Sequence, residues 1–330
     1  MTIRHLFTAL SGVIVVSASP FMKRTVSPPV ISVDFPDPTP FFNDGIWYAF
    51  ASQSNFTRGG PKVQVAQSTD FNTWQLQEGY DALRALPPNT VDTNEVWAPD
   101  VTRLNDGTYL MYFGTSPAEN PSRKCMYTAR SRDIRGPYDP DPNAFDCSLS
   151  EGGSLDASGF VDEDGKRYVT WKIDGNALGN GGSCLNSIPP LVNTPIVIQE
   201  VGADGVTKIG QRTTILNRDD IDGPTVEAPK IIKRDGFYIL FFSNNCFNSP
   251  LYTQSYAYSR NVRGPYVKAP RPLYTLGDQG LSGPGGGEAT ADGGRIVFHA
   301  LREGGVRFMH TATLEYNVNG FGRDTVQIVG

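Results

Sequence analysis

The sequence lacks the features that mark several classes of protein. It has no run of basic residues, and its formal net charge is −5. Nucleic acid and anionic membranes are therefore poor partners for it. No apolar stretch is long enough to span a bilayer comfortably, since a spanning helix needs about 20 apolar residues. Helical patterns are almost absent, which leaves β-strands as the expected main element.

Cysteine is scarce, with four residues in the chain: Cys125, Cys147, Cys184 and Cys246. Their spacings match no zinc-binding pattern, so we expect two disulfides and no metal site. Disulfides in turn indicate an oxidising compartment. Three pairings are possible. We favour Cys125–Cys147 and Cys184–Cys246, because the first two lie near each other in the sequence.

The N-terminus predicts secretion. An apolar stretch at residues 6–16 follows basic residues and precedes small residues at 17–19, as in a signal peptide. Lys23-Arg24 suits a second, dibasic trimming step. We therefore expect residues 1–24 to be a signal peptide and short pro-segment of an extracellular protein. The alternative is an N-terminal helix of the folded domain. Asn55, in Asn55-Phe56-Thr57, is a glycosylation acceptor for such a protein.

Glycine and proline are plentiful, at 35 and 25 residues, as expected when many short strands need many turns. Residues 131–138 and 259–266 share the pattern Ser-Arg-x-x-Arg-Gly-Pro-Tyr. Similar units, each with the pattern of four short strands, recur over the whole chain: residues 37–80, 97–140, 156–216, 227–270 and 286–328. Repeats of ~40–50 residues built from four strands are typical of propeller blades. We predict a five-bladed β-propeller with four-stranded antiparallel blades, forming a single domain over residues 25–330. A β-sandwich with accidental similarity is the alternative.

Acidic residues open the same local pattern in three units, at Asp37, Asp156 and Glu227. A short apolar run follows each of them, then a polar turn ending in Gly, then an aromatic-rich run. The first strand of a propeller blade lines the central axis, so the carboxylates would converge on one pocket. Clustered carboxylates oppose folding through repulsion and desolvation, which indicates a functional role. Trp97 precedes the corresponding position in the second unit and would form an apolar wall.

Structural roles for these residues are the alternatives. Asp37 could cap a turn before Pro38, and Asp156 could be an ordinary turn acid. Trp97 could be a core residue with no contact to a sugar. Glu227, which precedes Ala-Pro at a strand start, has no obvious structural use.

Four motifs carry a resemblance to glycoside hydrolase family 43, a family of five-bladed propeller enzymes. They are Asp34-Phe35-Pro36-Asp37-Pro38, Val96-Trp97-Ala98-Pro99-Asp100, Leu155-Asp156-Ala157-Ser158 and Val226-Glu227-Ala228-Pro229. The resemblance covers essentially the whole mature chain. It implies inverting hydrolysis, with Asp37 as general base and Glu227 as general acid. Asp156 would hold Glu227 in position and raise its pKa. The carboxyl groups of an inverting pair are expected to lie ~6.5–9.5 Å apart.

The resemblance also bears on sugar and ion binding. Arg302 falls in the fifth unit, where the family tends to place a sugar-binding arginine, although a surface ion pair is the alternative. Many members hold a central ion, often calcium, with a His in Gly-Pro-Gly-His. Here Gly286 and Gly287 follow Gly283-Pro284-Gly285, so that His is missing and a central calcium is in doubt. Glu288 or water could substitute, and no cofactor is required. We expect His299 and His310 to be structural.

The function that the resemblance implies is hydrolysis of plant cell-wall pentosans by a secreted monomer. β-Xylosidase and α-L-arabinofuranosidase activities on xylan and arabinan oligosaccharides are expected. Endo-1,5-α-L-arabinanase is the alternative, because no extra β-sandwich follows the fifth unit. A non-catalytic sugar-binding propeller is a second class, but it would be expected to lack one of the acids. Retaining fructan hydrolases typically carry their acid in Glu-Cys, whereas Ala228 follows Glu227 here.

Overall fold

A computed structural model describes residues 26–54, 59–92, 95–317 and 326–329. The predicted signal peptide and pro-segment, and the predicted glycosylation site Asn55, lie outside these residues. Strands dominate the described chain, and its helices are single 3-10 turns: η1 (Leu149–Glu151), η2 (Gly175–Leu178), η3 (Ser183–Leu185), η4 (Asp220–Asp222), η5 (Asp278–Gly280) and η6 (Glu303–Gly305). None of the described helices is long and apolar enough to cross a membrane.

The strands form successive antiparallel sheets that we number as blades one to five. Blade one contains β1 (Thr39–Asn43), β2 (Ile46–Ala51), β3 (Gln64–Ser68) and β4 (Gln75–Leu76). Blade two contains β5 (Trp97–Arg103), β6 (Tyr109–Thr115), β7 (Cys125–Ser131) and β8 (Asp139–Pro140). Blade three contains β9 (Ser154–Val161), β10 (Arg167–Ile173), β11 (Ile196–Val201) and β12 (Lys208–Leu216). Blade four contains β13 (Val226–Arg234), β14 (Phe237–Asn244), β15 (Thr253–Ser259) and β16 (Val267–Lys268). Blade five contains β17 (Gly285–Ala289), β18 (Arg295–Leu301) and β19 (Arg307–Thr313).

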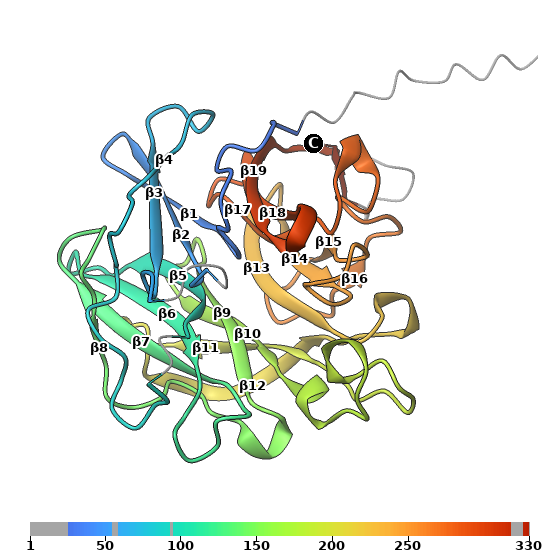
Figure 1. The fold of residues 1–330 in the computed structure, drawn as a ribbon, viewed down its shortest axis with the longest axis horizontal. Coiled ribbons are helices and arrows are strands. Elements are labelled where there is room, and N and C mark those ends of the chain that lie inside the picture. Colours follow the sequence, from blue (N-terminus) through green and yellow to red (C-terminus); the bar gives the residue numbers. More distant parts are fainter. Residues whose placement is uncertain (1–25, 55–58, 93–94, 318–325, 330) are drawn as a thin grey trace, which may run out of the picture.

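The blades follow one another around a ring, from blue blade one to red blade five (Figure 1). The predicted five-bladed propeller is therefore confirmed. Blade five differs in detail, because its own sheet has three strands and β20 (Glu315–Asn317) pairs separately with β21 (Gln327–Val329). Its outer edge is paired instead by the N-terminal segment. The amide of Val30 donates to the Met309 carbonyl at 2.8 Å, and that of Phe35 to the Arg307 carbonyl at 2.9 Å. The first described residues thus close the ring against its last blade.

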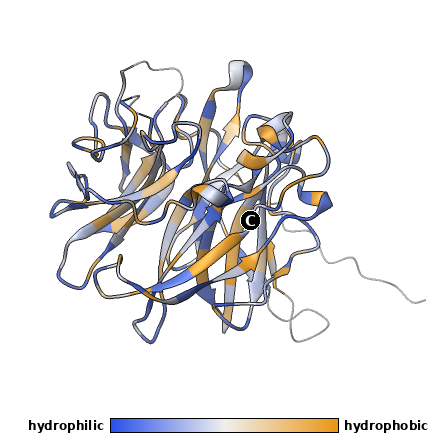
Figure 2. Cartoon of the chain, turned by 90° about the horizontal axis from the view of Figure 1, so that it is seen from below, coloured by the Kyte–Doolittle hydropathy of each residue, from blue (hydrophilic) through white to orange (hydrophobic). Residues whose placement is uncertain are grey.

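The second strand of each blade explains why these sequences form stacked sheets. Every residue of β6 and β10 is buried, and all but the last residue of β14. A strand covered on both faces is nearly continuously apolar instead of alternating. The apolar strand interiors lie between more polar loops in Figure 2.

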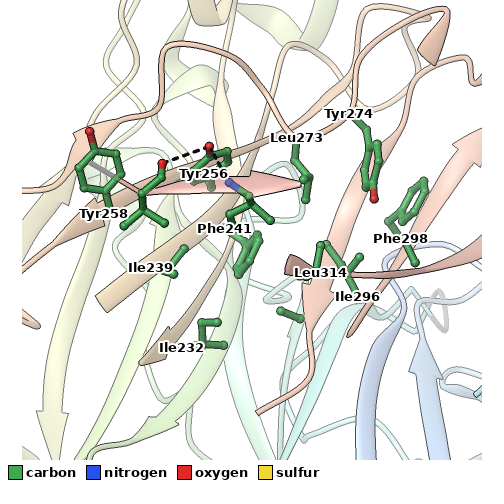
Figure 3. Packing of buried hydrophobic residues seen from close by; sticks show 14 of the residues in the cluster. Ile232, Ile239, Phe241, Tyr256, Tyr258, Leu273, Tyr274, Ile296, Phe298 and Leu314 are labelled. Atoms are coloured by element: carbon green, nitrogen blue, oxygen red, sulfur yellow. Dashed lines mark hydrogen bonds between the residues drawn. The ribbon is translucent and has the colours of Figure 1, made fainter. Parts of the chain in front are cut away.

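Large side chains fill the space between blades four and five (Figure 3). Phe241 of β14 and Phe298 of β18 belong to one buried cluster with Tyr256 and Ile296. The Tyr274 and Phe298 rings stack with centroids 4.9 Å apart. Truncating a buried Phe to Ala costs about 3–5 kcal/mol, so this packing is a major source of rigidity for the ring.

A β-bulge interrupts the inner strand at the same place in blades two to five, and Asp37-Pro38 stands in the equivalent place directly before β1. In blade four, Glu227 pairs with Ser243 and Lys230 pairs with Phe241, so two residues oppose one. The first residue at this place has a positive φ in each blade, at Asp37, Ala98, Asp156, Ala228 and Gly286. Side chains rarely adopt this conformation without a surrounding structure that imposes it. The bulge turns successive side chains in different directions at the inner mouth of the ring.

This register corrects one part of the sequence interpretation. Asp37 and Asp156 occupy equivalent positions, because each is the first residue at this place in its blade. Glu227 lies one residue earlier, since the positive φ in blade four belongs to Ala228. Trp97, which precedes Ala98, is the residue equivalent to Glu227. The acids therefore come from two adjacent positions of the repeat and not from one.

Candidate active site

The three predicted acids line one cavity of about 290 Å³ at the inner mouth of the ring. Asp37, Asp156 and Glu227 reach it from blades one, three and four, and Trp97 reaches it from blade two. The structure thus brings together four of the five residues predicted for catalysis and sugar contact. The roles assigned to them stay predictions.

Asp37 is held by Ser52 of its own blade and by polar groups from two strands of blade five. The Ser52 hydroxyl, directly after β2, donates to Asp37 Oδ2 at 2.6 Å, and the same hydroxyl accepts from the Ala98 amide at 2.8 Å. Arg307 Nη1 lies 3.7 Å from Asp37 Oδ2. The Asp37 amide donates to His299 Nδ1 at 3.1 Å. A hydroxyl donor and a guanidinium both suit a negatively charged carboxylate, and Asp37 is therefore no simple turn cap.

Asp156, which is half-buried, and Glu227, which is buried, form an electrostatically coupled pair. Asp156 Oδ2 accepts the Ala228 amide at 2.9 Å, which ties it to the residue after Glu227. Burial and then the negative charge of Glu227 raise the pKa of Asp156 to about 8. Lys172 opposes this rise. At neutral pH the cluster therefore retains a proton that an ordinary aspartate would have lost.

Lys172 is the cation beneath this pair. Its side chain is only 2% exposed, and Nζ lies 2.9 Å from Glu227 Oε2 and 3.0 Å from Asp174 Oδ1. Burial alone would lower the pKa of Lys172, but the charges of Asp174, Glu227 and Asp156 raise it above its ordinary value. The lysine is therefore charged, and it occupies one oxygen of the Glu227 carboxylate. Glu227 Oε1 is the oxygen left for chemistry.

The walls of the cavity combine aromatic and cationic side chains. Lys124 Nζ lies 4.0 Å from the Trp97 ring centroid, so an ammonium already covers one face of that indole. Phe247, 37% exposed, lies on the opposite loop, with the Arg307 guanidinium 5.4 Å from its ring centroid. Both Phe247 and Arg307 line the cavity.

Arg302, the predicted sugar-binding arginine, is not among the residues that line the cavity. Its guanidinium lies 5.8 Å from the Phe308 ring centroid and contacts His310 Nε2 at 3.4 Å. Arg307, five residues later and at the start of β19, lines the cavity. The two residues flank the η6 turn of blade five, and only one of them points into the mouth.

Both predicted disulfides are present, as Cys125–Cys147 and Cys184–Cys246. The second joins the insertion between β10 and β11 to the loop after β14. Cys184 and Asn176 of the insertion line the cavity, as does Phe247 next to Cys246. The bridge therefore fixes one wall of the pocket across blades three and four.

Several residues of the site escaped the sequence interpretation, namely Ser52, Lys124, Lys172, Asp174, Phe247, Tyr252 and Arg307. One signal was available for Lys172, because it is a charged residue next to the end of the buried strand β10, whose other charge, Arg167, stands at the start of the strand. No local pattern marks Ser52 or Phe247, since their neighbours come from other blades. Among the described residues, no group of three or more His, Cys, Asp and Glu side chains could hold a metal ion.

Comparison with known proteins gives a family match over nearly all of the described chain. The model of glycosyl hydrolases family 43 matches residues 26–326. A putative β-xylosidase of Xylanibacter ruminicola is 26% identical over 231 residues, covering 67% of this chain and 36% of that protein. An extracellular endo-α-(1→5)-L-arabinanase of Thermotoga petrophila is 26% identical over 296 residues, covering 78% of this chain and 54% of that protein. The chain thus spans between a third and just over half of the length of these relatives.

The fold is also similar to that of solved structures. A thermostable family-43 glycoside hydrolase superposes with a TM-score of 0.74 at 24% identity, covering 93% of this chain and 96% of that one. At this identity, the likeness concerns the fold.

Proposed function

Because the chain belongs to glycosyl hydrolase family 43, we propose that it is an inverting glycosidase that hydrolyses O-glycosyl bonds of pentose-containing glycans. The observation that carries this proposal is the convergence of Asp37, Asp156 and Glu227 on one cavity. Fold alone would not suffice, since one fold hosts many functions. Three acids that oppose folding, held by donors from other blades, support a catalytic site over a non-catalytic sugar-binding propeller.

Asp37 acts as the general base in the proposed reaction. It removes a proton from a water molecule, whose oxygen attacks the anomeric carbon on the face opposite the leaving group. The glycosidic C–O bond breaks, and its oxygen takes a proton from Glu227. The step leaves Asp37 protonated and Glu227 ionised, and exchange with solvent resets both. A single displacement of this kind inverts the anomeric configuration.

The proton for the leaving group comes from the coupled pair. Asp156 has a pKa of about 8, so the pair carries a proton at neutral pH. Lys172 holds Glu227 Oε2, and we assign delivery of the proton to Oε1. Asp156 thereby acts on Glu227 electrostatically. The hydrogen bond from the Ala228 amide holds the Asp156 carboxyl group beside the residue that follows Glu227. A proton that the pair still holds at working pH is what general-acid catalysis requires.

Exo-acting hydrolysis, as β-xylosidase or α-L-arabinofuranosidase, suits the dimensions of the cavity. Its volume of about 290 Å³ lies at the small end of the ~300–1,000 Å³ typical of ligand pockets. The wall tied by Cys184–Cys246 bounds it on one side. A pocket of this size suits a terminal sugar with its leaving group. Lys124, Asp174, Asn176 and Arg307 supply charged and polar groups for sugar hydroxyls.

Endo-1,5-α-L-arabinanase is the second candidate. It is favoured by the relatives from Thermotoga petrophila and Bacillus subtilis, both named extracellular endo-α-(1→5)-L-arabinanases. The same names and the two disulfides support secretion of this chain.

Products from defined substrates distinguish these candidates. The purified protein is incubated with aryl β-xyloside, aryl α-L-arabinofuranoside, xylooligosaccharides and debranched arabinan. Release of monomer only, from the non-reducing end, supports the exo proposal. Arabino-oligosaccharides appearing before monomer support the endo candidate. No turnover of any pentoside would overturn the proposed substrate class.

Substitution of the acids tests the roles. Glu227→Ala should lose activity strongly on substrates with poor leaving groups and much less on activated aryl glycosides, because these need no protonation. Asp37→Ala should lose activity on both, since water activation is common to them. Near-normal turnover by Asp37→Ala would contradict its assignment as base.

A further inference from the structure

Side chains meet on the axis of the ring, one step deeper than the active-site acids. The residue after each bulge, or after Asp37-Pro38 in blade one, is Thr39, Asp100, Ser158, Lys230 or Glu288. Lys230 Nζ lies 3.1 Å from Asp100 Oδ1 and 2.9 Å from Glu288 Oε2. Asp100 belongs to blade two and Lys230 to blade four, which are not neighbours in a five-membered ring. Their contact therefore crosses the centre.

The positive charge of Lys230 is balanced by acidic side chains where these residues meet on the axis. The side chain of Lys230 is 12% exposed and that of Asp100 only 4%. Burial alone would lower the pKa of Lys230, but Asp100 and Glu288 raise it above its ordinary value. Burial raises the pKa of Glu288 to about 8, against the opposing charge of Lys230. Near neutral pH one ammonium thus faces the Asp100 carboxylate and a Glu288 side chain that retains its proton.

His299 of blade five presents a donor to its surroundings, not a metal ligand. A backbone amide can only donate, so the Asp37 amide identifies His299 Nδ1 as the acceptor. Burial, Arg307 and His310 lower the pKa of His299 well below its ordinary value, so the ring is neutral. The proton of a neutral ring then resides on Nε2. Nε2 has no hydrogen-bond partner among the described residues.

A side chain at Gly286, where the metal-holding His of the family would stand, has no room. A Cβ at Gly286 would lie 2.5 Å from His299 Cε1 and 2.8 Å from Asp37 Oδ1. His299 thus fills the space that such a side chain would need. The residues present do not fit a central divalent ion, because they offer a protonated imidazole nitrogen and an ammonium already in contact with Asp100 and Glu288.

We propose that the Lys230 ammonium is the central cation of this propeller, tying blades two, four and five together where the family resemblance implies a calcium ion. The proposal concerns the ring and does not depend on the identity of the sugar substrate.

Metal analysis of the wild-type protein is the first test. We expect no stoichiometric divalent ion in protein purified without chelator. EDTA and added calcium should each leave the thermal unfolding midpoint unchanged. One divalent ion per chain, or a midpoint that falls in EDTA and recovers with calcium, would overturn the proposal. This test does not require a variant to fold.

Substitution is the second test. Lys230→Met should lower the unfolding midpoint by about 5–10 °C, because two acids lose their buried partner. The loss should be larger at pH 8 than at pH 5, where the acids can take up protons. Lys233→Met is the matched control, since Lys233 lies on the same strand and also pairs with two acids, Asp162 and the exposed Glu163, but away from the axis of the ring. Equal midpoints for the two variants would contradict the proposal.

A double variant separates charge from packing. Adding Asp100→Asn to Lys230→Met removes the unpaired charge, while the amide oxygen can still accept from the Gly159 amide, now bound at 2.7 Å. We expect the double variant to recover at least half of the decrease in unfolding midpoint that Lys230→Met causes. A double variant no more stable than Lys230→Met would show that Lys230 acts through packing and not as a cation.

Discussion

Asp156→Asn should stabilise the protein in a pH-dependent way while impairing activity. Burial and Glu227 raise the pKa of Asp156 from 3.8 to about 8, a rise of about four units. Each unit corresponds to 1.36 kcal/mol, so ionising Asp156 in the folded state costs at most about 6 kcal/mol. Asparagine has no such penalty, and its amide oxygen can still accept from the Ala228 amide.

The sign follows from proton binding. Between about pH 4 and pH 8 the folded wild type holds a proton that the unfolded chain has released. The free energy of unfolding of the wild type therefore decreases as pH rises through this window. Asp156→Asn lacks this loss, so its advantage should be small at pH 4–5 and largest above pH 8. Because the amide must fit beside Glu227, we expect an advantage of about 3 kcal/mol at pH 9.

Urea unfolding at pH 5, 7 and 9 measures the effect by linear extrapolation. Asp164→Asn is the matched control, since Asp164 lies in the exposed β9–β10 turn of the same blade, where hydrogen bonds from Lys166 lower its pKa. That variant should show no gain at any pH. An Asp156→Asn advantage that is absent, or that shrinks as pH rises, would refute the assignment of the raised pKa to Asp156.

Three further predictions address the surroundings of the acids. Lys172→Met should move the alkaline limb of kcat/KM to higher pH by about one unit or more, because the removed ammonium favours ionisation of the pair; an unmoved limb in a pH–rate profile would contradict this. Arg307→Met should lower kcat/KM about tenfold or more, whereas Arg302→Met should stay within about twofold, and steady-state kinetics giving the reverse order would support Arg302 as the sugar-binding arginine. Replacing Cys184 and Cys246 by Ser should lower stability and raise KM, whereas replacing Cys125 and Cys147 should lower stability by a similar amount, ~3–4 kcal/mol, without changing KM. Equal KM values would show that the Cys184–Cys246 bridge does not shape the pocket.

The blade pattern was predictable because burial leaves a strong trace in sequence. β6 and β14 lie inside their sheets and read as mostly apolar runs, and turns such as Asp106-Gly107 separate the strands. The pairing register at the inner mouth of the ring was harder to predict, because a bulge inserts one residue that no period-two pattern reveals. Ala98-Pro99 and Ala228-Pro229 did mark it, since the two pairs occupy the same bulge positions.

Contacts between blades could not be predicted, because each joins residues far apart in sequence. Lys172 and Glu227 are separated by 55 positions, and Lys230 and Asp100 by 130. Arg302 and Arg307 illustrate the same limit over a short range, since spacing does not reveal which end of a turn faces the axis. The outer strand of blade five was also missed, because residues before the first repeat supply it.

The stereochemistry of the first turnover tests the central claim most directly. NMR spectra of the reducing sugar in the first minutes of hydrolysis, with the best pentoside substrate, report the anomer formed before mutarotation. Direct attack by water activated at Asp37, with Glu227 protonating the leaving oxygen, predicts the anomer opposite to that of the substrate. Initial release of the same anomer would contradict this mechanism and the roles assigned to both acids.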